Sequence, residues 1–264
     1  MGAGSLQDCA ASFAGLIDGI NVPECEDGVR MSALAASSHL IGAGAEPILH
    51  LLTRDMNRIA LQANILGAAS LGVKSILCTS GRHQTLTSSR SARGVFDVDP
   101  IQLLSIANAM RKTGQLADGQ AIEGSLEILL GADTNPFSEP VELQVMTLGK
   151  AIGAGADFVM TQPVFKTDKF SEWMKLVRDK GLHERTQIIA SIMPLSVARG
   201  VVRAGSTRFK LDDQVSDTVT DVEYASGIAK ALKETEGVRG IYIMAGADYG
   251  FAKDVLSASG IAGS

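Results

Sequence analysis

Residues 46–99 begin with EPILHLLTRDMNRIALQANILGAASLGVKSILCTSGRHQ and, after a polar run, end with GVFDVD. The apolar run 48–52 predicts a strand. The polar cluster Thr53-Arg54-Asp55-Asn57-Arg58 then predicts a network at a helix start, with the aspartate near the positive end of the helix. Apolar residues such as Ile59 recur at helical spacing up to Gly72, and 73–78 predicts a second strand. Together these elements form a βαβ unit, in which the loops after the strands usually carry the chemistry.

The alternation of single strands with helices continues along the whole chain. Seven apolar segments are predicted to be strands, at 17–22, 48–52, 73–78, 126–131, 158–162, 187–193 and 240–244. Such alternation predicts a parallel sheet with helices packed on it. A chain of 264 residues also has the ordinary length of one α/β barrel. We therefore expect a single TIM (β/α)8-type parallel barrel over residues 1–264, with one of its eight strands missing.

Composition and charge exclude several classes of protein. The net charge is −5 and no block of the chain is strongly basic, which argues against a nucleic-acid ligand. The three cysteines, Cys9, Cys25 and Cys78, are far apart, so neither a disulfide framework nor a zinc site is expected. We find no signal peptide and no apolar run of membrane-spanning length, and we therefore expect a cytoplasmic protein without membrane contact.

The motifs of residues 46–99 occur together in one known family. HLLTRDMNRIALQ, a glycine-ended helix and a strand followed by Ser80-Gly81-Arg82-His83 closely resemble the methylenetetrahydrofolate reductase family. The resemblance continues in order through VFDVDPIQLL, GADTNPF, GAGADFVMTQPVF and IMPL, and it covers nearly the whole chain from Ile17 onward. It implies a TIM barrel that binds a flavin and a folate at one mouth.

The chain departs from this family at positions that the resemblance assigns to hydride transfer. The family's first strand ends in a catalytic glutamate, and nothing before Leu6 can form that strand. Arg82 stands where the family has a catalytic aspartate, and a guanidinium cannot donate or relay a proton at neutral pH. Ala151 replaces the lysine that meets the flavin phosphate, although Lys150 is adjacent, and Pro23 replaces a hydroxyl residue. A missing strand would leave an open seam unless another chain or segment covers it.

Other positions keep residues that suit a ligand. Gln162 matches the glutamine that hydrogen-bonds the pterin in the family, since an amide offers both a donor and an acceptor; the alternative is a polar cap at a strand end. His50 matches a histidine on the flavin-facing strand, but it equally suits the core of an apolar run. Asp133 and Asn135 follow a later strand, where Asn-Pro also simply begins a turn. Met193 is a further residue expected at the ligand mouth.

Two residues are candidates for catalysis. Glu24 is the surviving carboxylate at the expected mouth, and the alternative is a solvated acid beside Glu26 and Asp27. Arg82 is the second candidate. Together with His83 it could instead grip an anion, such as the glutamate tail of folate or a partner's phosphate.

Three functions remain open at this stage. We favour flavin-independent methyl transfer between (methyl-)tetrahydrofolate and a partner such as a corrinoid protein. The alternative is an FAD-dependent methylenetetrahydrofolate reductase completed by another subunit, against which the missing carboxylates speak. The second alternative is a non-catalytic subunit of a one-carbon complex, against which the retained Gln162 speaks. Tetrahydrofolate is the expected ligand, FAD is a less favoured cofactor, no metal is expected, and we expect an oligomer.

Overall fold

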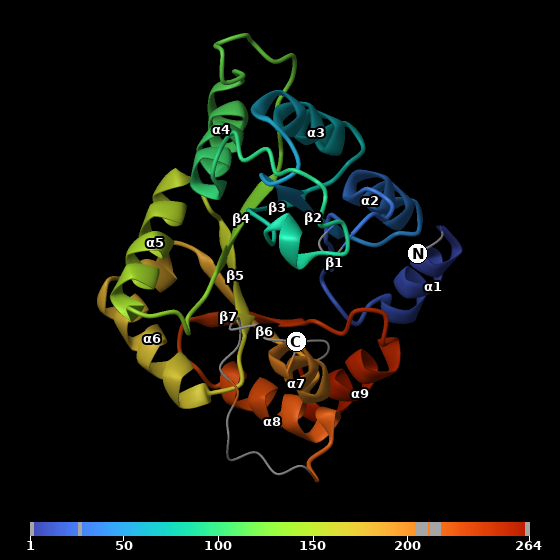
Figure 1. Ribbon diagram of the computed structural model, residues 1–264, viewed down its shortest axis with the longest axis vertical. Helices are drawn as coiled ribbons and strands as arrows, with labels where there is room; N and C mark the ends of the chain where they lie inside the picture. Colours follow the sequence, from blue (N-terminus) through green and yellow to red (C-terminus); the bar gives the residue numbers. More distant parts are fainter. Residues whose placement is uncertain (1–2, 26–27, 204–210, 212–217, 262–264) are drawn as a thin grey trace. The chain divides into compact units, whose positions relative to one another are not determined.

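The computed structural model describes residues 3–25, 28–203, 211 and 218–261 (Figure 1). In chain order the elements are α1 (Ala3–Phe13), β1 (Ile20–Val22), α2 (Ala33–Gly42), β2 (Pro47–Leu52), α3 (Arg58–Ser70), β3 (Ser75–Thr79), η1 (Gln84–Leu86), α4 (Pro100–Thr113), β4 (Leu129–Thr134), α5 (Val141–Ala154), β5 (Phe158–Pro163), α6 (Thr167–Asp179), η2 (Leu182–Glu184), β6 (Gln187–Ile192), α7 (Leu195–Arg203), α8 (Asp221–Lys233), β7 (Val238–Ile243) and α9 (Tyr249–Ser259). No helix among the described residues is both long and apolar enough to cross a membrane.

The chain divides into two compact units. Unit 1 comprises Met1–Ala132 and Gly153–Asp157, and unit 2 comprises Asp133–Ile152 and Phe158–Ser264. The boundary falls inside β4, whose first residues belong to unit 1 and whose last two belong to unit 2.

Unit 1 is built on parallel strands with helices packed against them. β1 pairs with β2, β2 with β3, and β3 with β4. Helices α2 and α4 pack against β2 and β3, respectively. Leu49 and Leu51 of β2 are almost completely buried, whereas Ile48 and His50 on the opposite face are half-buried. Because successive side chains of a strand point to opposite faces, one face of β2 is a packed core and the other can hold polar groups.

Unit 2 repeats this construction with three further parallel strands. β5 pairs with β6, and β6 pairs with β7. Helix α8 packs against β6, β7 and α9. Helix α6 buries Phe170 and Trp173 completely, and their rings pack against each other with centroids 5.7 Å apart. The apolar stripe of α6 is therefore core.

The order of the strands defines the fold class. The seven strands follow one another in the sheet from β1 to β7, and helices alternate with them along the chain. This order confirms the predicted TIM-type parallel α/β class. Among the described residues no strand precedes β1, and the segment before it forms α1.

Several element boundaries differ from the predictions. β1 begins at Ile20 and not at Ile17, which is 36% exposed, and β4 covers Leu129–Thr134 instead of 126–131. Ile59 was expected on the buried stripe of α3 but is 73% exposed. Helix α7 was not predicted, because LSVARGVVR contains a glycine and three valines, which are weak helix formers.

Candidate functional site

A buried arginine holds together the chain segments that follow the first three strands. Arg54, the second residue after β2, is 3% exposed. Its Nε and Nη2 each donate to a different carboxylate oxygen of Asp55, both at 2.7 Å. Nη2 also donates to the carbonyl of Cys25 after β1 at 2.7 Å, and Nη1 donates to the carbonyl of Arg82 after β3 at 2.8 Å. One planar guanidinium thereby fixes three strand ends of unit 1, which the single ammonium of a lysine could not do.

In the polar cluster after β2, one residue caps the next helix and another pairs with Arg54. Asn57 is the N-cap of α3, and its Oδ1 accepts the N–H of Ala60 at 3.0 Å. The helix therefore starts within the predicted cluster, and Asn57, not Asp55, is its cap. The carboxylate of Asp55 compensates the charge of Arg54, since a buried guanidinium needs a partner of opposite charge.

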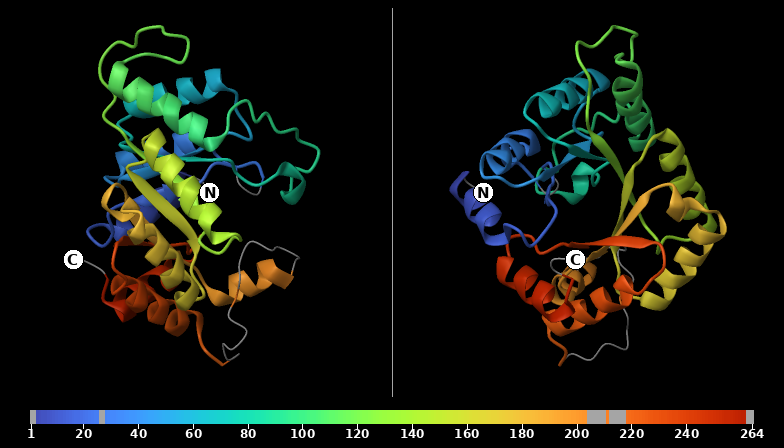
Figure 2. Two further views of the ribbon diagram at one scale, coloured as in Figure 1. Left: turned by 90° about the vertical axis from the view of Figure 1, so that its left-hand side faces the viewer. Right: turned by 180° about the vertical axis from the view of Figure 1, so that it is seen from behind.

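The long connection from β3 to α4 is fastened to the same region at its far end. The N–H of Val95 donates to the carbonyl of Arg54 at 2.6 Å. The backbone N–H and the Nε of Arg58 both donate to Asp97 at 2.9 Å, and the side-chain hydrogen bond from Arg58 lowers the pKa of Asp97 to about 2. Figure 2 shows the connection extending away from the strands and helices of unit 1. Both of its ends are thus anchored beside Arg54.

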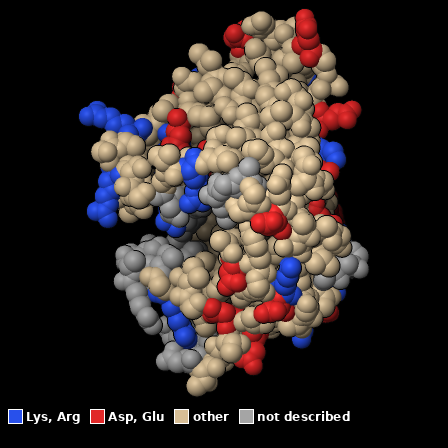
Figure 3. Space-filling model, turned by 90° about the vertical axis from the view of Figure 1, so that its right-hand side faces the viewer, with Lys and Arg blue, Asp and Glu red and all other residues tan. Residues whose placement is uncertain are grey.

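The outer surface of this connection is aromatic and basic. Phe96 is 45% exposed, and its φ of 45° lies in the left-handed region that residues other than glycine rarely adopt. Its ring stacks with that of His83, with centroids 6.4 Å apart. Arg90 and Arg93 are exposed, and Figure 3 shows basic side chains gathered on this projecting segment. In a chain with a net charge of −5, such a local positive field attracts anionic groups.

Arg82 and His83 begin this connection. The side chain of Arg82 is half-buried, and Arg54 holds its carbonyl, so the backbone at Arg82 is fixed. His83 is exposed, and its Nδ1 lies 2.8 Å from the Oγ1 of Thr85 at the start of η1. The structure thus gives Arg82 a defined position and His83 a local capping contact, while their ligand roles stay predictions.

Glu24 stabilises the start of a helix. Its Oε2 accepts the N–H of Ala33, the first residue of α2, at 3.0 Å, and its Oε1 accepts a weak hydrogen bond from the thiol of Cys25 at 3.5 Å. A carboxylate suits this place because the first amides of a helix lack partners and the helix end is positive. Its neighbours Glu26 and Asp27 lie outside the described residues. The catalytic role of Glu24 stays a prediction.

His50 forms a neutral polar pair on the half-buried face of β2. Its Nε2 lies 2.7 Å from the Oδ1 of Asn21 on β1. Burial lowers the pKa of His50 to about 4, so the imidazole is neutral at pH 7. Since a carbonyl oxygen can only accept, the proton lies on Nε2, and Nδ1 keeps its acceptor capacity.

In unit 2, Gln162 presents an uncommitted amide at the end of β5. It is the one residue of this strand that is not buried. Its side-chain amide makes no hydrogen bond within the part of the chain that the structure describes. The backbone around it is held by Thr161, whose Oγ1 donates to the carbonyl of Gln162 at 2.9 Å. The amide therefore keeps both a donor and an acceptor for a ligand.

Of the remaining predicted residues of unit 2, Asn135 and Met193 have structural contacts. The Oδ1 of Asn135 accepts the N–H of Phe137 at 3.0 Å, which is the contact of a turn. Asp133 is exposed near the end of β4. Met193 is 8% exposed and belongs to a hydrophobic cluster with Phe165. These contacts are structural, and the ligand roles of the three residues stay predictions.

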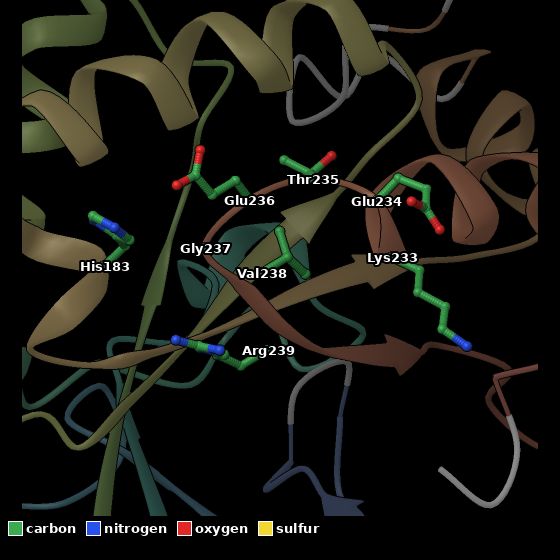
Figure 4. A pocket seen from close by; sticks show the side chains of 8 residues that line it. All are labelled: His183, Lys233, Glu234, Thr235, Glu236, Gly237, Val238 and Arg239. Atoms are coloured by element: carbon green, nitrogen blue, oxygen red, sulfur yellow. The ribbon is translucent and has the colours of Figure 1, made fainter.

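A hollow in unit 2 lies at the amino end of a strand, whereas catalytic residues are expected at the carboxyl ends. It is lined by His183 and by residues 233–239 of the turn between α8 and β7 (Figure 4). These residues lie at the amino end of β7, whereas Gln162 lies at the carboxyl end of the parallel strand β5. Catalytic residues of TIM-type folds come from the carboxyl ends. We therefore assign no catalytic role to this hollow.

Two residues organise these strand ends through contacts that the sequence did not predict. Arg54 was expected in a helix-start network and at the ligand mouth. A charged residue two positions after the apolar run 48–52 also suits a buried ion that needs several acceptors. Thr161 was not predicted to have a role, because that role depends on a strand register that the sequence does not specify.

Comparison with known proteins identifies the family. A family model described as methylenetetrahydrofolate reductase matches residues 17–225. The chain belongs to the methylenetetrahydrofolate reductase family. A comparison with curated proteins gives no match.

Two solved structures show the same fold. An uncharacterized protein from Clostridium thermocellum that binds two copies of 5-methyl-5,6,7,8-tetrahydrofolic acid matches with a TM-score of 0.66 at 12% identity, over 96% of this chain and 88% of that chain. The enzyme 2,3-dimethylmalate lyase, of the PEP mutase/isocitrate lyase superfamily, matches with a TM-score of 0.54 at 14% identity, over 98% and 82% of the two chains. At these identities the likeness concerns the fold alone.

His50 should make the stability of the protein depend on pH. Its pKa falls from 6.5 to about 4 on folding, so the folded state binds fewer protons between these values. The contribution of His50 to the free energy of unfolding should therefore be complete above pH 6.5. It should decrease, by at most about 3 kcal/mol, as the pH falls to about 4. His50→Gln, which can still donate to Asn21, should remove this part of the dependence in urea unfolding between about pH 4 and 7. His39→Gln, at an exposed histidine of α2, should keep the parental dependence, and a parental slope in His50→Gln would contradict the assignment.

Arg54→Lys should loosen the strand ends of unit 1. A lysine keeps the charge but cannot reach Asp55, Cys25 and Arg82 together, so the free energy of unfolding should fall by about 2 kcal/mol or more. Hydrogen–deuterium exchange of residues 81–96 should become faster. The matched control is Arg58→Lys, which alters an exposed pair and should leave stability nearly unchanged. Equal effects of the two variants would show that Arg54 has no central position.

Proposed function

We propose that this chain binds a tetrahydrofolate coenzyme through Gln162 and transfers its methyl group without a flavin. The observation that carries the proposal is the half-buried amide of Gln162, which has no partner among the described residues and lies at a strand end in a member of the methylenetetrahydrofolate reductase family. A pterin edge presents neighbouring donors and acceptors that one carboxamide can match. The 5-methyl-5,6,7,8-tetrahydrofolic acid bound to the Clostridium thermocellum protein supports the choice of ligand.

The residues at the positions matched to a flavin do not suit that cofactor. Ala151, in place of the lysine for the phosphate, is 6% exposed within α5 and brings no cation. Lys150 is exposed, and consecutive helical residues point about 100° apart, so its ammonium does not substitute at that position. Arg82 adds a fixed positive charge where the family has a carboxylate. The proposed reaction therefore contains no flavin step.

The proposed chemistry breaks the bond between N5 of the folate and its methyl carbon. The methyl group passes to a nucleophile, for which we propose the reduced cobalt of a corrinoid protein, and the electron pair of the broken bond stays on N5. This nitrogen must be protonated or hydrogen-bonded as it leaves. Arg82 stays charged at neutral pH and does not give up a proton, so we propose that its fixed positive charge assists the transfer while the proton comes from solvent.

Replacing Gln162 by Leu should weaken the binding of 5-methyltetrahydrofolate. The variant would leave buried polar groups of the pterin without partners, which costs roughly 1–3 kcal/mol, or about 5- to 150-fold in the dissociation constant. Isothermal titration calorimetry measures this change. Gln187→Leu, at an exposed position at the start of β6, is the matched control and should bind like the parent. Unchanged affinity of Gln162→Leu, or no binding by the parent protein, would remove the proposal.

The purified protein should form methyl-cobalt from 5-methyltetrahydrofolate and a reduced corrinoid, and it should not oxidise NADH with FAD and methylenetetrahydrofolate. Arg82→Asp should slow the transfer by about a hundredfold, since it removes the fixed positive charge that we propose assists this step. Arg90→Asp makes the same charge change at an exposed position of the same connection and should have a small effect. Robust NADH oxidation by the isolated chain would instead favour the reductase alternative.

A further inference from the structure

We propose that Thr161 is a positioning residue for Gln162, because its hydroxyl builds a step in β5 that turns the Gln162 amide toward its ligand. This inference rests on the proposed function, in which that amide binds the pterin.

The step is visible in the register between β5 and β6. Val159 pairs with Ile188 and Met160 with Ile189, as in a regular parallel ladder. The next pair is Pro163 with Ser191, so β5 advances by three residues where β6 advances by two. An extra residue on one strand is a β-bulge, and bulges beside active sites re-aim side chains.

The hydroxyl of Thr161 supplies the hydrogen bonds that the step would otherwise lose. The backbone N–H of Ser191 donates to the Oγ1 of Thr161 at 3.1 Å, and this hydroxyl in turn donates to the carbonyl of Gln162 at 2.9 Å. Beyond the step, the N–H of Val164 donates to the carbonyl of Ser191 at 2.8 Å. Thr161 is 4% exposed and Ser191 is 0% exposed, so water could not easily replace these bonds.

The step changes the place of Gln162. In a regular register Gln162 would pair with Ser191, and Pro163 would pair with the residue after Ser191. Because of the extra residue, Pro163 pairs with Ser191 and Gln162 does not. This explains why Gln162 is half-buried although every other residue of β5 is buried. The amide thereby stays available at the strand end.

Thr161→Val tests the hydroxyl with little change in volume. The variant should bind 5-methyltetrahydrofolate about tenfold more weakly in calorimetry, whereas Thr161→Ser, which keeps the hydroxyl, should stay within about twofold of the parent. Thr186→Val is the matched control, because Thr186 is 2% exposed and its hydroxyl has no partner among the described residues. Its affinity should not change. In a Gln162→Leu background, Thr161→Val should add little, since both changes remove one interaction.

The outcomes separate this inference from the proposed function. If Gln162→Leu weakens binding and folded Thr161→Val binds like the parent, Thr161 is only structural and the inference fails. A lower Tm with an unchanged Kd has the same meaning. If Gln162→Leu binds like the parent, the proposed function itself fails. Should Thr161→Val not fold, Thr161→Cys decides: its thiol is a weak hydrogen-bond partner, so it should bind more weakly than Thr161→Ser, and equal affinities would overturn the inference.

Discussion

The hydrogen bonds of one buried guanidinium set the arrangement of the strand ends in unit 1. An arginine that is 3% exposed loses most of its hydration, and this loss is tolerated only when charge and hydrogen bonds are compensated. Asp55 supplies the charge, and the carbonyls of Cys25 and Arg82 supply further acceptors. These acceptors follow different strands. The hydrogen bonds that the Arg54 guanidinium requires therefore constrain the geometry of three chain segments. The positions of Arg82 and of the connection to α4 both depend on these hydrogen bonds.

Unit 2 reaches a similar result with a neutral group. The hydroxyl of Thr161 accepts from one strand and donates to its own, which keeps an irregular step hydrogen-bonded inside a sheet. In both units a polar side chain just at a strand end satisfies backbone groups, so that a rigid strand carries an irregular segment. This is the general way in which α/β folds combine stable strands with variable chemistry at their carboxyl ends.

The sequence predicts most of the fold because its signals are local. Helix α4 runs from Pro100 to Thr113, because the capping box between Asp99 and Gln102, only three residues apart, fixes its start and Gly114, with a φ of 64°, ends it. The candidate site is harder to predict because its key contacts join distant segments. Nothing local shows that Arg54 reaches Cys25 and Arg82, residues 29 and 28 positions away.

The pattern of kept and lost residues bears on how this member of the family diverged. Gln162 keeps an amide that the described chain does not use, and the backbone at that position is built to expose it. Because this amide is half-exposed, water can satisfy it in the free protein and a ligand can replace that water on binding. By contrast, under the proposed function Arg82 and Ala151 do not take over the roles that the resemblance assigns to their positions. Binding and redox chemistry make separate demands on side chains, so a folate site can persist while the chemistry performed on the folate changes.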